Sequence, residues 1–119
     1  MAVMRTYTGG CHCGEVRYET TVDLATVMAC NCSLCTKRGI LWAFVQPEHF
    51  ALRSGEEDLT DYQFNKKVIH HLFCSTCGVE SFARGKMPDG SDVVAINVRC
   101  LDGIDIAALE VKPFDGRSL

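Results

Sequence analysis

The chain has 119 residues and a mass of 13.1 kDa, a size that fits one domain with one hydrophobic core. Hydrophobic residues make up 47% of it and charged residues 23%, a balance that excludes a disordered polymer. The net charge of −3 argues against a general nucleic-acid binder, and no apolar run approaches the roughly 18 residues of a membrane-spanning helix. We therefore expect a single domain over residues 1–119 that binds neither nucleic acid nor membrane.

Short apolar runs, separated by Gly, Pro, Asp and Asn, dominate the chain and predict strands. The expected strands cover 15–19, 40–45, 50–54, 59–64, 68–73, 79–83 and 93–98. In the second of these, Trp42 and Phe44 share one face, where core packing is favoured over a substrate wall. Only 35–39 and 102–109 are suited to a short helix, and no window has a long repeat of 3.6 residues. The pattern predicts an all-β domain of eight or more short strands.

Eight cysteines are the unusual feature of the composition. A disulfide scaffold or scattered buried thiols would be the plainest explanations. However, the first residues contain no apolar segment typical of a secretory signal, so we expect a cytoplasmic protein, where thiols stay reduced. Spacings of two or three residues instead favour thiolates that converge on a metal ion. Seven cysteines fall into three groups and the eighth is isolated: Cys11 and Cys13; Cys30, Cys32 and Cys35; Cys74 and Cys77; and Cys100.

Zinc is the favoured metal, because it prefers thiolate ligands and tetrahedral geometry. An iron–sulfur cluster is the second choice, since it usually needs four well-placed cysteines and the middle group has three. A first, structural zinc is predicted on the two pairs. A glycine after each pair, Gly14 and Gly78, allows the tight backbone turn that directs amides toward the sulfurs. The four ligands of this closed site are Cys11, Cys13, Cys74 and Cys77.

The middle group, Cys30, Cys32 and Cys35, is predicted to form a second zinc site with an open position. Three protein ligands and one exchangeable position are typical of catalytic zinc, whereas a fourth protein ligand would make the site structural. The candidates for a fourth ligand are Cys100, His12, His70 and His71. For Cys100 a buried thiol is favoured, for His12 a solvent-facing side chain, and for the adjacent His70 and His71 an ordinary core or surface role.

Three segments carry a family resemblance: 10–18 (Gly-Cys-His-Cys-Gly-Glu-Val-Arg-Tyr), 30–35 (Cys-Asn-Cys-Ser-Leu-Cys) and 71–78 (His-Leu-Phe-Cys-Ser-Thr-Cys-Gly). Together they resemble the glutathione-dependent formaldehyde-activating enzyme family, also known as the centromere protein V domain. Segments 50–59, 62–65, 97–103 and 114–117 extend the likeness over nearly the whole chain. The resemblance implies an all-β, Mss4-like fold of short antiparallel sheets with two zinc ions. In the family the structural ion lies on the first and third cysteine groups and a labile one on the middle group.

The resemblance also implies a carbon–sulfur lyase activity, in which glutathione adds to formaldehyde or a similar small aldehyde. Cys30, Cys32 and Cys35 would then be the catalytic metal ligands. Lys37 and Arg38 are candidates for binding a substrate carboxylate. His71 and Glu80 are candidate proton carriers. The alternative is a non-catalytic zinc-binding adaptor with the same fold.

Overall fold

A computed structural model describes residues 4–64 and 66–116 of the chain, with ten strands and one α-helix among them. Four short 3₁₀ helices, η1–η4, cover Pro47–His49, Glu56–Asp58, Val98–Cys100 and Ile106–Ala108. The α-helix α1 is Ser33–Arg38. The strands are β1 Arg5–Gly10, β2 Arg17–Val22, β3 Val27–Cys30, β4 Leu41–Val45, β5 Phe50–Ser54, β6 Leu59–Tyr62, β7 His70–Cys74, β8 Phe82–Lys86, β9 Asp92–Asn97 and β10 Val111–Phe114.

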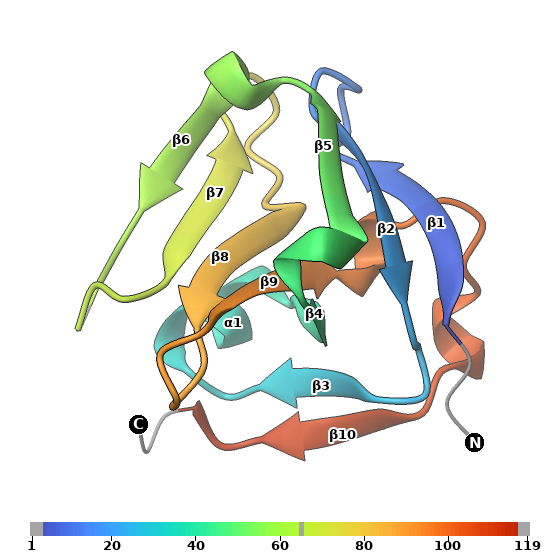
Figure 1. Cartoon of the computed structure of the whole chain (residues 1–119), viewed down its shortest axis with the longest axis vertical. Coiled ribbons are helices and arrows are strands. Elements are labelled where there is room, and N and C mark those ends of the chain that lie inside the picture. The colour runs from blue at the N-terminus through green and yellow to red at the C-terminus, as the bar shows by residue number, and fades with distance from the viewer. Residues whose placement is uncertain (1–3, 65, 117–119) are drawn as a thin grey trace.

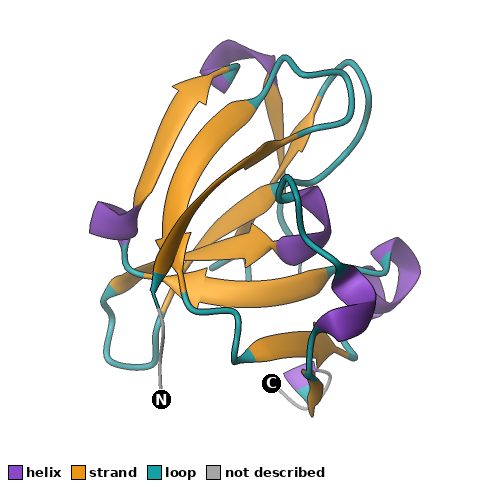
Figure 2. Ribbon diagram, turned by 90° about the vertical axis from the view of Figure 1, so that its right-hand side faces the viewer, coloured by secondary structure: helices purple, strands orange, loops and turns teal. Residues whose placement is uncertain are grey.

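The strands form two sheets that lean against each other (Figure 1). One has three strands in the order β1-β2-β5, and the other has seven in the order β10-β3-β4-β9-β8-β7-β6. Neighbouring strands are antiparallel except β10, which runs parallel to β3 at the edge of the larger sheet. Figure 2 shows the short helices in the connections between these strands. The prediction of an all-β, Mss4-like fold is confirmed.

Three aromatic rings hold the two sheets together. Tyr18 on β2 and Phe50 on β5 lie 5.1 Å apart between ring centroids, and Phe82 on β8 lies 5.7 Å from Tyr18 and 4.8 Å from Phe50. The Tyr18 hydroxyl donates to the carbonyl of Ser81 over 2.9 Å, which satisfies the one polar atom of a side chain that is only 1% exposed. These contacts fix the angle at which the smaller sheet meets the larger one.

The opposite face of the larger sheet carries a second, smaller apolar cluster. Because successive strand residues point to opposite faces, Ala83 points away from the side that buries Phe82. It packs with Cys35, Ile40, Trp42 and Ala95. This cluster seats α1, and with it the middle cysteine group, against the outer face of the sheet.

The segment 102–109, suited by its sequence to a short helix, forms no α-helix and contains only the 3₁₀ helix η4. Gly103 has a left-handed backbone (φ 72°), and the Asp105 side chain accepts from the amide of Ala107 to form a local turn, both of which compete with a helix. The expected helix at 35–39 exists as α1, two residues earlier and closed by Gly39. In the described part of the chain, no helix is both long and apolar enough to span a bilayer.

Candidate metal centres and their surroundings

The first cysteine cluster joins the end of β1 to the end of β7. Cys11, Cys13, Cys74 and Cys77 place their sulfurs within 4.8 Å of one another, with 3.5 Å between the sulfurs of Cys11 and Cys13 and 3.7 Å between those of Cys13 and Cys74. Four ligands about 2.3 Å from a tetrahedral zinc lie about 3.8 Å apart. The sulfurs are therefore already spaced for that ion, although the pairs are some sixty residues apart in sequence.

Backbone geometry explains how each pair turns its sulfurs inward. Gly14 and Gly78, which follow the two pairs, adopt left-handed conformations with φ of 87° and 80°, a region that suits glycine. After the first of these turns, the amide of Val16 comes back to donate to the sulfur of Cys11 over 3.3 Å. The prediction that glycines make these turns is confirmed.

The four sulfurs do not ionise alike. Burial by itself raises the pKa of Cys77, but hydrogen bonds from the amides near Cys13 and Val79 and from neighbouring thiols lower it to about 6. At Cys13 a backbone hydrogen bond lowers the pKa, yet burial and the three neighbouring thiols outweigh it and raise the pKa to about 12. Ionisation of one thiol in this cluster therefore opposes ionisation of its neighbours. A divalent cation would stabilise the cluster with all four thiols ionised.

The second cysteine cluster lies where β3 passes into α1. Cys30 ends the strand, Cys32 caps the helix and Cys35 lies in its first turn, and their sulfurs also lie within 4.8 Å of one another. The amide of Cys35 donates to the sulfur of Cys32, and that of Cys32 to the sulfur of Cys30, each over 3.4 Å. The helix cap, which normally uses a hydroxyl or carboxylate, here uses a sulfur and so orients a thiolate.

The second cluster has three ligands. Among the described residues, no histidine, carboxylate or further cysteine joins the group. The four candidates for a fourth ligand lie elsewhere: His12 and His70 are exposed, His71 is buried against Glu80, and Cys100 is half-buried outside both clusters. Burial raises the pKa of Cys100 to about 12, and its sulfur joins neither group of converging sulfurs.

Trp42 is buried in the smaller apolar cluster, as core packing predicts, and its indole also contacts the second cysteine cluster, which the sequence pattern does not indicate. Its Nε1–H donates to the sulfur of Cys35 over 3.2 Å. This hydrogen bond lowers the pKa of Cys35, but burial raises it more, so the net shift is upward. At Cys32 burial raises the pKa, but amide hydrogen bonds from Cys35 and Leu34 and the neighbouring thiols outweigh it and lower the pKa. Within the second cluster, the half-buried Cys32 is therefore the cysteine whose thiol ionises most readily.

A buried ionic network supports α1 from behind. The Glu80 carboxylate, whose side chain is 1% exposed, pairs with Nη1 of Arg38 through Oε1 and with Nδ1 of His71 through Oε2, the latter over 2.8 Å. Since a carboxylate only accepts, Nδ1 of His71 carries the proton. Of the two candidate carboxylate binders, Lys37 is exposed and Arg38 is occupied by Glu80. His70 is exposed and the adjacent His71 is buried, so the two side chains face opposite sides of β7.

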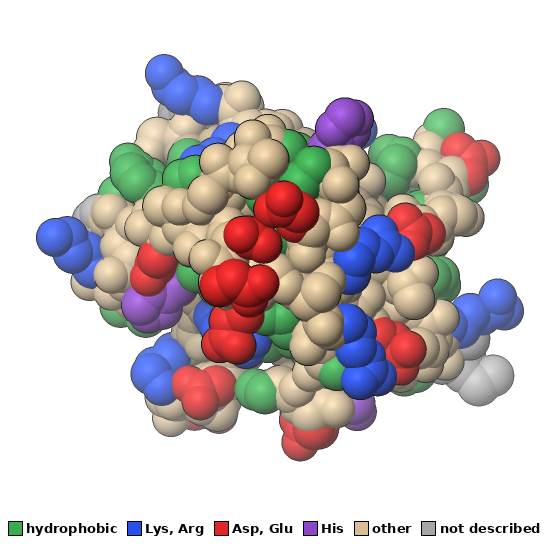
Figure 3. All heavy atoms as spheres, turned by 90° about the horizontal axis from the view of Figure 1, so that it is seen from above, with side chains coloured by type: hydrophobic (Ala, Val, Ile, Leu, Met, Phe, Trp, Pro, Cys, Tyr) green, Lys and Arg blue, Asp and Glu red, His purple; other side chains and the backbone are tan. Residues whose placement is uncertain are grey.

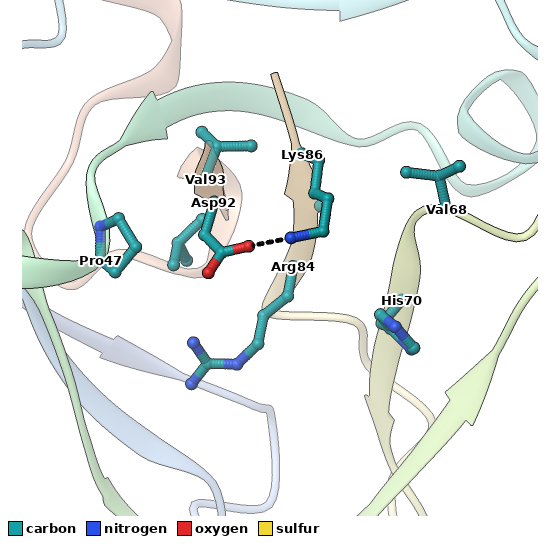
Figure 4. Close-up of a pocket in the computed structure, with 9 residues that line it drawn as sticks. Pro47, Val68, His70, Arg84, Lys86, Asp92 and Val93 are labelled. Atoms are coloured by element: carbon teal, nitrogen blue, oxygen red, sulfur yellow. Dashed lines mark hydrogen bonds and ion pairs between the residues drawn. The ribbon is translucent and has the colours of Figure 1, made fainter. Parts of the chain in front are cut away.

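A cavity of about 320 Å³ lies apart from both clusters (Figure 4). Arg84 crosses it, with its guanidinium over the rings of Phe50 and Phe82 at 5.3 and 5.5 Å, and Lys86 is paired with Asp92 at 2.6 Å. No cysteine is among the residues that line this cavity.

Acidic side chains gather on the top of the molecule (Figure 3). Burial raises the pKa of Asp58, and the nearby carboxylates of Glu15 and Glu57 raise it further. This group adjoins the first cluster, because the amide of Ser75 donates to the carbonyl of Asp58 over 2.7 Å. The surface around the closed site is therefore anionic.

These features define a class: an all-β protein with a four-cysteine and a three-cysteine cluster, each able to bind a metal ion. The family model for the glutathione-dependent formaldehyde-activating enzyme matches residues 6–114, and the chain belongs to that family. A crystal structure of a Rhodobacter sphaeroides protein is similar to it, with a TM-score of 0.79 and 31% sequence identity over 89% of this chain and 97% of that one.

Proposed function

We propose that the chain is a zinc-dependent enzyme that adds a small aldehyde, such as formaldehyde, to a thiol, such as glutathione, or removes it. The single observation that carries the proposal is the difference between the two clusters: four sulfurs in one and three in the other. Family membership supports the same substrates. We further propose that each cluster holds one zinc ion, structural on the first and catalytic on the second.

The reaction adds the S–H bond of the thiol across the C=O bond of the aldehyde. A carbon–sulfur bond forms, the π electron pair of the carbonyl moves to its oxygen, and the proton of the thiol ends on that oxygen. Zinc, when bound, supplies a Lewis acid that favours the thiolate or polarises the carbonyl. Cys30, Cys32 and Cys35 would hold the ion, and a site with three protein ligands would leave one position for a substrate atom.

The residues around the second cluster have separate proposed roles. Lys37 is exposed two residues after Cys35, and its ammonium group suits an ion pair with a carboxylate of a tripeptide thiol. Arg38 keeps other guanidinium N–H groups beside its contact with Glu80, but that contact ties it mainly to the fold. Glu80 already binds two partners, which favours a structural role over proton transfer for both Glu80 and His71.

The experiment is a magnetisation-exchange NMR measurement of the interconversion of formaldehyde, glutathione and their adduct. We expect the wild-type protein with zinc to accelerate the exchange and Cys32→Ser to abolish the acceleration. Cys100→Ser is the matched control, because Cys100 lies outside both clusters, and it should keep the wild-type rate. No acceleration by a protein that holds two zinc ions would favour the non-catalytic adaptor and overturn the proposal.

A further inference from the structure

The last described residues of the chain lie against the second cysteine cluster. β10 runs parallel to β3 with Phe114 opposite Cys30, and the amide of Asn31 donates to the carbonyl of Phe114 over 3.1 Å. The Asn31 side chain extends this pairing by donating from Nδ2 to Oδ1 of Asp115 over 2.9 Å. Asn31 lies between two of the cluster's cysteines, so these hydrogen bonds fix the strand end beside the sulfurs.

Gly116 makes the closest approach. A Cβ atom built on it would lie closer than 3.0 Å to the sulfur of Cys30, a separation that real Cβ atoms essentially never show, and 3.6 Å from the Cβ of Cys32. Its backbone is outside the left-handed region, so conformation does not demand a glycine here. The requirement is for space: the backbone passes where any side chain would meet a cluster sulfur.

The other side of the cluster is closed by the fold. Cys35 is 4% exposed and lies beneath Trp42, whereas Cys30 and Cys32 are half-buried. A molecule that reaches the sulfurs therefore comes from the side of Cys30 and Cys32. This is the side on which Asp115 and Gly116 lie.

We infer that residues 111–116 form a strap that controls access to the second cluster, with Gly116 and Asn31 as its positioning residues. Gly116 lets the strap lie directly beside Cys30, and Asn31 holds it there. The strap allows only small thiols and electrophiles to reach the three sulfurs. It also slows the exchange of a metal ion bound to them. Its importance for catalysis rests on the proposed function, but its contact with Cys30 does not.

The test is the rate at which iodoacetamide alkylates Cys30 in the purified full-length protein, followed by peptide mass spectrometry. Gly116→Ala forces the strap and the Cys30 sulfur apart, and Asn31→Ala removes the hydrogen bond from Nδ2 of Asn31 to Asp115. We expect Asn31→Ala to speed alkylation of Cys30 by about fivefold, the change that loss of one ordinary hydrogen bond produces in an opening equilibrium. Gly116→Ala should speed it at least as much, because the added methyl group cannot share the space of the sulfur.

Gly85→Ala is the matched control, because the added methyl group would meet Ile69 at an ordinary 3.4 Å far from any cysteine. Alkylation of the half-buried Cys100 reports general unfolding and should stay constant. Unchanged Cys30 rates in both Gly116→Ala and Asn31→Ala, or an equal rise at Cys30 and Cys100, would overturn the inference.

A second readout separates this inference from the proposed function. In the zinc-loaded protein, release of the second ion to a chromogenic chelator should also be about fivefold faster in Gly116→Ala, with release from the first cluster unchanged. Wild-type protein that binds only one zinc ion would contradict the proposed function. The alkylation rates would still decide whether the strap covers Cys30, because they require no metal at the second cluster.

Discussion

At the scale of single residues, Trp42 is the side chain, other than the cysteines, whose replacement should change the zinc affinity of the second cluster most directly. Trp42→Phe keeps an aromatic ring in the apolar cluster but removes the N–H that donates to Cys35. A hydrogen bond to a charged acceptor contributes about 1.5 kcal/mol or more, so zinc affinity of the second site should fall about tenfold. Competition titration with a chromogenic chelator measures it.

The control for Trp42→Phe lies on the same strand. Phe44 is 45% exposed and Phe44→Leu should leave both zinc affinities unchanged. Equal affinity in Trp42→Phe and the wild type would show that the indole only fills space.

Glu80 should matter for stability rather than for zinc affinity of the first cluster. Glu80→Ala leaves His71 buried without its acceptor and Arg38 without its partner. Breaking a buried ion pair from one side costs about 3 kcal/mol or more, which denaturant unfolding of the zinc-loaded protein would measure. Lys86→Ala removes an exposed pair with Asp92 and should cost less than about 1 kcal/mol. Similar losses in the two variants would contradict a structural role for Glu80.

At the same scale, spacing alone predicted which cysteines group together. Ligands two or three residues apart must lie close, so 7 of the 8 cysteines were assignable before the structure. The contacts of Trp42 with Cys35 and of Gly116 with Cys30 were not, because they depend on where separate elements come to rest. No local pattern in the sequence records that placement.

At the scale of elements, the strands with alternating or β-branched runs were predicted and the others were not. β5 has the predicted limits, and β4, β6, β7 and β9 differ from prediction by a few residues. β1 contains Thr, Tyr and two glycines, and β3 and β10 have four residues each. Such segments lack a period of their own and become strands because a neighbour offers hydrogen bonds. β8 begins three residues later than expected, since an irregular segment with the buried Glu80 and Ser81 precedes it.

A substitution in the connection from β5 to η2 should lower the free energy of unfolding as much as a substitution within a strand. Gly55 has φ of 88°, and a Cβ atom there would lie closer than 3.0 Å to the carbonyl oxygen of Glu15. Gly90 has the same φ with nothing within 4 Å. Gly90→Ala should therefore cost only the left-handed strain of roughly 1–2 kcal/mol, and Gly55→Ala at least about 1 kcal/mol more from the clash. Denaturant unfolding measures the loss of stability in the two variants. Equal losses would mean that the backbone at Glu15 moves away from the added methyl group at no cost in free energy.

At the scale of the whole molecule, the two clusters have different structural weight. The first one ties the smaller sheet, through the residue after β1, to the larger sheet at the end of β7. The second cluster is local, since its ligands span only Cys30 to Cys35. A closed four-thiolate zinc contributes about 10 kcal/mol or more to folding, which is comparable to the whole stability of a small domain.

Graded removal of zinc should therefore proceed in two steps. With a chelator of increasing strength, the second ion should leave first, because only three sulfurs would hold it and two of them, those of Cys30 and Cys32, are partly exposed. The circular dichroism of the sheets should persist. Loss of the first ion should coincide with unfolding. Cys32→Ser should show only the second of these steps, whereas Cys74→Ser should fail to reach the folded state. Simultaneous release of both ions, or retention of the sheets after both have gone, would contradict a structural role for the first cluster and an accessible ion at the second.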